Sequence, residues 1–429
     1  MKREKNCIPR LAAMLLCLCL CAALLAGCGK TEKNLWGKTV TAELAHVPAE
    51  AFDVEDARLC GFSPDGSKAL ISYNPETYLY DMNTGKRIYL TPGDAATEEA
   101  LRLAARWQLK DLAPEQREQV QAKLDALQGR ELVTAAVSAG WYGEKTSLRA
   151  LDLPGADGRW MCTVVQGSGL FLMLDCESGK VYGRIEGQYE DARGDLLLAK
   201  GPFPQGELTL VNVKTGEETP VPAFREGYGQ RAAAFLPDGG VVAILMEKEL
   251  DLERGMSCLL ATRSAKGEEQ VFDLGRIAFT HVPDDILCLG EDMLLLRVQG
   301  LSYRPSFLVN REDGSICILA QREEKIEKCK LETDESGVPL LSEGTEQIYL
   351  MSALPDGETV LMFGGDGALY LYRPESGETR LLVRDVEGQW LPNLGTSCFT
   401  FNGYDRLWAF VWLQEGDFRD AYIQLHVQD

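Results

Sequence analysis

A repeated pair of turns recurs along most of the chain and constrains its fold more than any other feature. In the clearest copy, the turn ending at Gly66 is followed by two β-rich runs and then by Asn83-Thr84-Gly85, so the turn glycines lie 19 residues apart. A second copy runs from Gly357 to Gly377, an interval of 20 residues. Glycine supplies the positive φ that tight hairpin turns require. Each copy therefore predicts a unit of four short strands.

Weaker copies with intervals of 21 to 28 residues place their second turn glycines at Gly179, Gly216, Gly267 and Gly314. A seventh unit begins near Asn402 and ends with residues 421–427, one strand early. The β-rich stretch 38–45 can supply that missing strand, closing a ring that has no long exposed edge. We therefore predict an all-β ring of seven units, with six or eight as alternatives.

The segments Phe62-Ser-Pro-Asp-Gly66 and Asp81-Met-Asn-Thr-Gly85 resemble the repeats of TolB-like and WD-repeat-like β-propellers. The resemblance covers residues 38–429, although the Trp-Asp dipeptide of true WD repeats is absent. It implies a β-propeller architecture in which each unit is one blade. It implies no activity, because propellers include hydrolases, lyases, dehydrogenases and binding modules.

Two stretches of strong helix formers, 97–110 and 114–128, interrupt the β pattern. Pro114 suits a first helical turn and Gly129 suits a C-terminal cap. Apolar residues recur at helical spacing: Leu101, Ala104, Ala105 and Leu109 in the first stretch, and Val120, Leu124 and Leu127 in the second. We predict a helical hairpin at about 94–130 between the first two blades. It is either a decoration of the propeller or a docking element for a partner.

The N-terminus has the layout of a secretory signal, with a basic start and an apolar run over residues 11–25 that is too short for a membrane-spanning helix. It ends on Leu25-Ala26-Gly27-Cys28, which resembles the bacterial lipobox. The resemblance implies cleavage between Gly27 and Cys28, acyl chains such as palmitate attached at Cys28, and a location on the extracytoplasmic face of the cell membrane. The alternative is an ordinary signal peptide.

These features divide the chain into three parts: a signal peptide at 1–27, a lipidated tether at 28–37 and a propeller domain at 38–429. A second insertion, 322–347, is dense in Glu and Lys and is predicted to be a solvated loop. The net charge of −21 argues against nucleic-acid partners, because an acidic surface repels phosphate. Membrane contact is therefore expected through the lipid.

The cysteines beyond Cys28 are widely spaced and include no Cys-x-x-Cys pair, which disfavours a zinc site or a redox motif. Buried thiols are favoured over a disulfide network for these eight residues: Cys60, Cys162, Cys176, Cys258, Cys288, Cys317, Cys329 and Cys398.

The sequence contains no recognisable catalytic, metal or cofactor motif. It holds three histidines, of which His46 and His426 fall on the strands expected to close the ring. Trp141, Tyr142 and Trp390 lie near glycine-rich turns and are candidate ligand-facing aromatics, whereas tryptophans within apolar runs, such as Trp160, are expected in the core.

We therefore expect a monomeric, non-catalytic binding or scaffold module for a protein, peptide or glycan. One alternative is a hydrolase or lyase whose acidic residues converge on the central channel from separate blades. Carboxylates near an Arg or Tyr, with shifted pKa values, would favour that enzyme; a channel lined by small residues such as Ala233-Ala234 and Ser352-Ala353 would not. Another alternative is an accessory subunit of an envelope export or sensing system.

Overall fold

The computed structural model describes most of the chain after residue 34. The described ranges are 35–52, 57–63, 66–73, 76–106, 109, 112–139, 150–151, 160–165, 170–184, 188–201, 206–212, 215–249, 254–298, 305–348, 350–354, 356–364, 366, 368–384, 399–402, 406–409 and 421–428.

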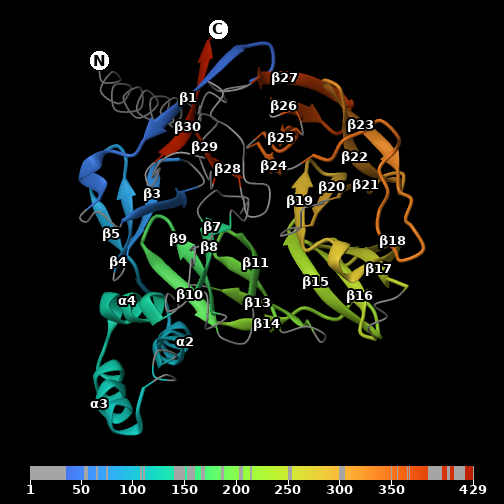
Figure 1. Cartoon of the computed structure of the whole chain (residues 1–429). Helices are drawn as coiled ribbons and strands as arrows, with labels where there is room; N and C mark the ends of the chain where they lie inside the picture. The colour runs from blue at the N-terminus through green and yellow to red at the C-terminus, as the bar shows by residue number, and fades with distance from the viewer. Residues whose placement is uncertain are drawn as a thin grey trace, which may run out of the picture.

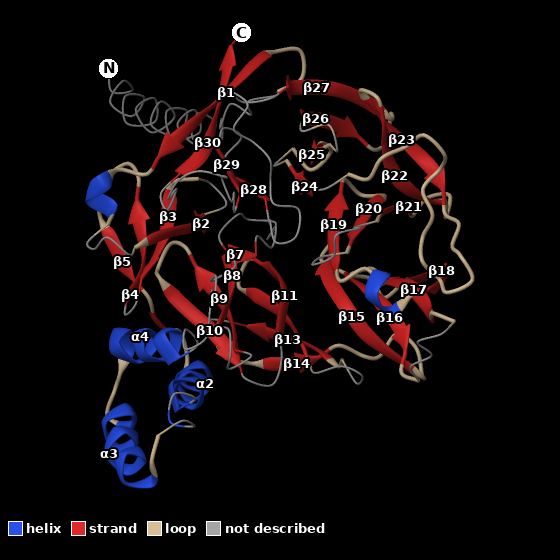
Figure 2. Ribbon diagram, in the orientation of Figure 1, coloured by secondary structure: helices blue, strands red, loops and turns tan. Residues whose placement is uncertain are grey.

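The described residues form seven sheets of four or five strands, and Figure 1 shows these sheets arranged in a ring. Neighbouring sheets contact each other around this ring, and strands dominate the molecule in Figure 2. The predicted all-β propeller is confirmed by this architecture. The blade number of the complete chain stays a prediction, because segments between these strands lie outside the described ranges.

The first four sheets follow one another along the chain. The first sheet contains β2 (Arg58–Phe62), β3 (Lys68–Tyr73), β4 (Glu76–Asp81) and β5 (Arg87–Tyr89). The second contains β6 (Thr91–Pro92), β7 (Ala150–Leu151), β8 (Trp160–Val165), β9 (Leu170–Asp175) and β10 (Lys180–Arg184). The third contains β11 (Gln188–Arg193), β12 (Leu196–Lys200), β13 (Leu208–Asn212) and β14 (Glu218–Pro220). The fourth contains β15 (Tyr228–Phe235), β16 (Val241–Glu247), β17 (Met256–Arg263) and β18 (Glu269–Ile277).

The remaining three sheets complete the ring. The fifth contains β19 (Asp285–Leu289), β20 (Met293–Arg297), β21 (Ser306–Asn310), β22 (Ile316–Arg322) and β23 (Lys325–Lys330). The sixth contains β24 (Leu350–Ala353), β25 (Val360–Phe363), β26 (Ala368–Arg373) and β27 (Glu378–Arg384). The seventh contains β1 (Thr39–His46), β28 (Phe399–Asn402), β29 (Arg406–Ala409) and β30 (Ala421–Gln428). Two short 3₁₀ turns lie at Ala49–Ala51 and Phe279–His281.

The turn that the sequence repeats has the same hydrogen bonds in several sheets. In the first sheet, the Asp81 carboxylate accepts from the Asn83 and Thr84 backbone N–H groups, and Gly85 N–H closes the turn on the Asp81 carbonyl. Gly85 has φ +69°, a conformation that favours glycine. An Asp or Asn followed by a glycine four residues later therefore sets the hairpin geometry.

The N-terminal strand β1 completes the last sheet, as the sequence predicts. It pairs antiparallel with the C-terminal strand β30 along its whole length, from Thr39 opposite Gln428 to His46 opposite Ala421. The sheet order is β1-β30-β29-β28, so the outer strand comes from the start of the domain. The ring is thus closed by hydrogen bonds between its two ends.

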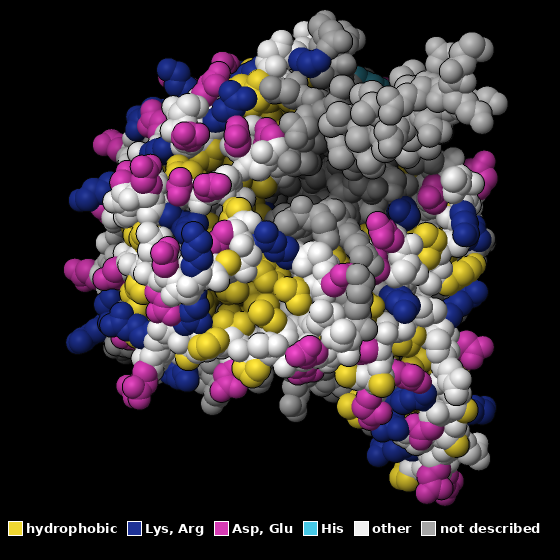
Figure 3. Space-filling model, turned by 180° about the vertical axis from the view of Figure 1, so that it is seen from behind, with side chains coloured by type: hydrophobic (Ala, Val, Ile, Leu, Met, Phe, Trp, Pro, Cys, Tyr) yellow, Lys and Arg dark blue, Asp and Glu magenta, His cyan; other side chains and the backbone are white. Residues whose placement is uncertain are grey.

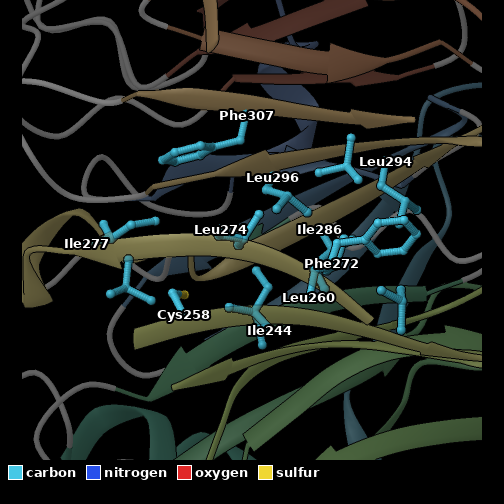
Figure 4. Packing of buried hydrophobic residues seen from close by; sticks show 14 of the residues in the cluster. Ile244, Cys258, Leu260, Phe272, Leu274, Ile277, Ile286, Leu294, Leu296 and Phe307 are labelled. Atoms are coloured by element: carbon cyan, nitrogen blue, oxygen red, sulfur yellow. The ribbon is translucent and has the colours of Figure 1, made fainter. Parts of the chain in front are cut away.

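The core lies between the faces of neighbouring sheets. Figure 4 shows one such layer, in which Leu260 and Phe272 of the fourth sheet pack with Ile286, Leu296 and Phe307 of the fifth. These side chains are almost fully buried. Each fully buried side chain of this size contributes about 1.5–3 kcal/mol, which holds adjacent sheets together.

Both predicted helices occur in the insertion after β6, as α2 (Ala95–Ala105) and α3 (Pro114–Asp125); a third described helix, α4 (Gly129–Ala139), follows them and was not predicted. Gly129 has the positive φ of a cap, +53°, yet it also begins α4. The predicted apolar face is confirmed, because Leu101 and Leu124 are buried in the cluster that the helices form with the first two sheets. α2 and α4 pack on the propeller, and α3 projects away from it (Figure 1).

The second insertion, predicted to be a solvated loop over 322–347, is partly ordered as sheet. Residues Lys325–Lys330 form β23, the outer strand of the fifth sheet, in which Ile326 is buried. Ile326 and Cys329 are both buried, but their spacing of three residues departs from the two-residue period of a strand with one solvent-facing side. The remainder returns to the fourth sheet, where Ala278 N–H donates to the Gly337 carbonyl.

Candidate functional site

Charged side chains gather where the third, fourth and fifth sheets meet. The first strands of these sheets, β11, β15 and β19, contact each other and are therefore the inner strands of the ring. We call the charged set the inner cluster. It consists of Glu190, Asp191, Lys200, Arg231, Asp285 and Arg297.

Two consecutive carboxylates of β11 both reach the fourth sheet. Glu190 Oε2 accepts from the Ala233 N–H at 3.1 Å, and Asp191 Oδ2 accepts from the Phe235 N–H at 2.7 Å. Consecutive strand residues normally point to opposite faces, but a bulge between Tyr189 and Asp191 removes that alternation. These carboxylates therefore accept hydrogen bonds from backbone N–H groups of β15.

Basic side chains balance part of this charge. Lys200 Nζ lies 2.8 Å from Glu190 Oε1 and also donates to the Arg231 carbonyl at 2.5 Å. Arg297 donates through Nε to Asp285 Oδ2 at 2.5 Å, in a pair directly opposite each other on β20 and β19. The Glu190–Lys200 pair is almost fully buried, so neither charge is well solvated.

Burial changes the acidity of the two β11 carboxyls. It raises the pKa of Asp191 to about 7, against the opposing effect of the N–H groups of Phe235 and Ala192; the nearby carboxylates Asp285 and Glu190 add to the increase. Burial also raises the pKa of Glu190, although Lys200 opposes the increase. Asp191 is therefore positioned to exchange a proton near neutral pH.

The Phe235 peptide links three sheets. Its N–H donates to Asp191 of β11, and its carbonyl accepts a 3.3 Å contact from the Cys288 thiol of β19. Burial raises the pKa of Cys288 to about 12, so the thiol stays protonated and unreactive. Asp191 and Cys288 thus connect the third and fifth sheets to the fourth through the backbone of Phe235.

The site residues predicted from the sequence lie outside the described part of the chain. This holds for the lipidation site Cys28, the cleavage residue Gly27 and the candidate ligand-facing aromatics Trp141, Tyr142 and Trp390. Their predicted roles stay predictions.

The structure separates the two ring-closing histidines. His426 lies opposite Thr41, His46 lies opposite Ala421, and His426 Nε2 contacts Glu43 Oε1 at 2.7 Å. They therefore form no joint site. Trp160, expected in the core, is fully buried and donates to the Gly194 carbonyl of the next sheet.

The inner strands contain both residue types that were expected to distinguish an enzyme from a binding module. Ala233 and Ala234 are buried small residues of β15, as the binding-module interpretation requires. The carboxylates Glu190 and Asp191, one with a pKa near neutrality, are what the enzyme interpretation requires. Over the described ranges, no group of three or more His, Cys, Asp or Glu side chains is arranged to hold a metal ion.

Five cysteines whose side chains the structure describes are free thiols. Cys176, Cys258 and Cys329 are buried, and Cys288 and Cys317 are half-buried. Burial raises the pKa of Cys258 to about 12, as it does for Cys288. These cysteines therefore pack as small apolar side chains.

Comparison with known proteins gives no family. No family model and no curated protein matches the chain. Among the helices that the structure describes, none has the length and apolar character needed to cross a bilayer.

Several solved structures are similar in shape at low sequence identity. The WD40 repeats of RRP9 are 12% identical, with 91% of this chain and 100% of that chain covered at a TM-score of 0.47. The extracellular domain of a putative one-component system from B. thetaiotaomicron is 10% identical at a TM-score of 0.42; the match covers 90% of this chain but 40% of that one. An oligogalacturonate lyase from Vibrio parahaemolyticus is 11% identical, with 64% of this chain and 88% of that chain covered at a TM-score of 0.32. None of these scores supports an argument about activity, and the fold rests on the sheets described above.

Proposed function

We propose that this chain is an extracytoplasmic lipoprotein, anchored in the cell membrane through Cys28, whose propeller is a non-catalytic binding or scaffold module for a protein or glycan. The non-catalytic part of this proposal is supported by the bonding of the inner cluster, whose charged groups are held by the backbone and by one another. Glu190 and Asp191 accept from the Ala233 and Phe235 N–H groups, and Lys200 and Arg297 hold carboxylates in ion pairs. Groups held this way stiffen a ring and leave few donors or acceptors for a substrate.

The contact surface that best fits this function is α3. α2 and α4 contribute most of the helical side chains buried against the propeller, whereas α3 contributes Leu124 together with the half-buried Val120. Apart from the half-buried Gln121, the rest of α3 is exposed, and Figure 3 shows acidic and basic side chains interspersed on the projecting helical part at lower right. A helix that the fold does not need for its core is free to meet a partner.

Crosslinking tests this assignment. Intact cells that carry the full chain are treated with a short crosslinker, and the captured proteins are compared with those captured by a Glu118→Lys variant in exposed α3. Glu312→Lys, at an exposed turn between β21 and β22, is the matched control. We expect the charge reversal in α3 to abolish the capture of a specific partner, which the Glu312→Lys control still captures. Equal capture by all three proteins rejects α3 as the docking element.

A second function, a propeller hydrolase or lyase, is favoured by one observation. Asp191 has a pKa raised to about 7 by burial, with Glu190 and Asp285 close by, which is a suitable state for a general acid. This function predicts that wild-type protein cleaves some member of a polysaccharide panel and that Asp191→Asn abolishes the cleavage. Cleavage that survives in the variant excludes Asp191 as the acid.

An accessory role in an envelope export or sensing system is a narrower form of the binding function. The crosslinking experiment distinguishes it, because the captured partner would then be a component of such a system.

A further inference from the structure

The first described residues are fixed against the sixth sheet. Leu35 is almost completely buried, Trp36 Nε1 donates to Thr359 Oγ1 at 3.0 Å, and the Arg373 guanidinium lies 4.4 Å from the centre of the Trp36 ring. Arg380 donates to the carbonyls of Leu35 and Lys38. We call residues 35–38 with these partners the N-terminal clamp. It fixes where the chain leaves the ring.

The clamp limits the distance between the propeller and an anchor at Cys28. Six residues, 29–34, separate Cys28 from Leu35. Even fully extended, this segment spans only about 25 Å. Residues 35–37 were assigned to the tether from the sequence, but their packing shortens the free part. The side of the ring that carries the clamp must therefore stay near the anchor.

The surface around the clamp is basic although the chain is acidic. The clamp segment, β23 and the stretch from Arg373 to Arg384 together contain seven basic and three acidic residues, in a chain of net charge −21. We call these residues the basic rim. β23 and β27 lie side by side, and the Ile326 N–H donates to Thr379 Oγ1. Lys325 and Lys328 are exposed on β23.

Some rim charges are paired. Arg373 lies 3.5 Å from Glu378, Arg384 pairs with Glu324, and Lys330 lies 2.9 Å from Glu332. These are exposed pairs, which solvent screens. Glu324 and Glu332 lie just outside the rim; counted together with it, they give seven basic and five acidic residues, so the balance stays positive.

We propose that the basic rim is the face of the propeller that stands against an anionic lipid surface; this rests on the proposed anchor at Cys28. Short tethering brings the rim to the membrane, its lysines attract anionic headgroups, and the acidic remainder is repelled. α3 lies at the lower left of Figure 1, away from β1 and β27 at the top. The orientation therefore leaves the helical insertion accessible to a partner.

Energy transfer to the membrane tests the orientation. The full lipidated chain is bound to vesicles that contain phosphatidylglycerol and an acceptor-labelled lipid, with a fluorescent amino acid at position 375 or at position 119. Glu375 lies in the exposed turn between β26 and β27, and Gln119 lies on the exposed side of α3. We expect more efficient transfer from position 375.

Charge variants make the test specific. In the Lys325→Gln/Lys328→Gln variant, the difference in transfer efficiency between positions 375 and 119 should shrink. Lys266→Gln, at an exposed turn between β17 and β18, should leave that difference unchanged. Equal transfer from both positions, or no response to the rim variant, overturns the orientation while the anchor stands. Failure of the chain to float with the vesicles overturns the anchor and the orientation together.

Discussion

The Asp191 side chain connects the third sheet to the fourth, and its burial removes the carboxylate from water. Its carboxylate accepts from Phe235 and Ala192 N–H groups, yet burial raises its pKa to about 7. Between about pH 4, where a free Asp titrates, and about pH 7, the folded chain binds more protons at this site than the unfolded chain. The contribution of Asp191 to the free energy of unfolding therefore falls as the pH rises through that window.

Asp191→Asn removes this titration while keeping one carbonyl oxygen as an acceptor. We expect the variant to gain stability relative to wild type by more than about 1 kcal/mol as the pH rises from 4 to 8. Urea unfolding across this pH range measures the difference.

Asp313→Asn is the control, because hydrogen bonds from Ser315 lower the pKa of that exposed carboxyl. Its titration stabilises the fold above the unfolded pKa, so this variant should instead lose stability relative to wild type as the pH rises through the acid range. A pH slope unchanged by Asp191→Asn would show that this carboxyl does not titrate in the window.

The inner cluster was not predicted from the sequence, although a signal was present. Glu190-Asp191 and Asp284-Asp285 are adjacent acidic pairs at or beside the starts of inner strands β11 and β19. Each sheet supplies a few members, so no local motif forms. The bulge that turns Glu190 and Asp191 toward the same neighbour depends on the packing of whole sheets and has no local sequence mark.

At the scale of elements, α3 is held to the rest of the insertion by its C-terminus. Arg102 donates to the Asp125 carbonyl at 2.9 Å, and Arg106 contacts the Asp125 carboxylate at 2.7 Å. Basic groups at a helix C-terminus stabilise its last turn. The attachment of the projecting helix therefore depends on few contacts.

Asp125→Ala should loosen α3 while leaving the ring intact, because the substitution removes the Arg106 contact and that from Gln121. Hydrogen exchange should accelerate in residues 114–125 and remain at wild-type rates in β16 and β17. Glu115→Ala, at the other end of α3 and exposed, is the control. Wild-type protection of α3 in Asp125→Ala would contradict this account.

Strands were easier to predict from the sequence than the insertions. β3 and β4 lie between Gly66 and Gly85, and β25 and β26 lie between Gly357 and Gly377, as the spacing of the turn glycines predicts. α4 was missed because its glycine suggests a helix end. β23 was missed because it is rich in Lys and Glu and its two buried residues, Ile326 and Cys329, are three apart and so lack the two-residue period that marks a strand.

At the scale of the whole molecule, the ring depends on the pairing of its two ends. Glu43 lies opposite Gln424 in the β1–β30 register, and residues across a strand pair lie within reach of a disulfide. We expect Glu43→Cys/Gln424→Cys to crosslink under oxidising conditions and to raise the unfolding midpoint. Closing so long a loop constrains the unfolded chain by up to about 5 kcal/mol.

A shifted pair, Glu43→Cys/Gln428→Cys, is the control, because position 428 lies opposite Thr39. Equal crosslinking by the two pairs would contradict the register. The absence of crosslinking in the first pair would contradict the closure itself.

The proposed attachment of the ring to the membrane depends on Cys28, because only six residues separate Cys28 from the N-terminal clamp beside the basic rim. The anchor is the premise of both the proposed function and the orientation. Mass spectrometry of the mature N-terminus, on protein extracted from membranes of the native cell, tests it most directly. The account predicts a chain that begins at Cys28 and carries a diacylglyceryl group. A chain that retains residues 1–27, or that begins at an unmodified Cys28, would contradict it.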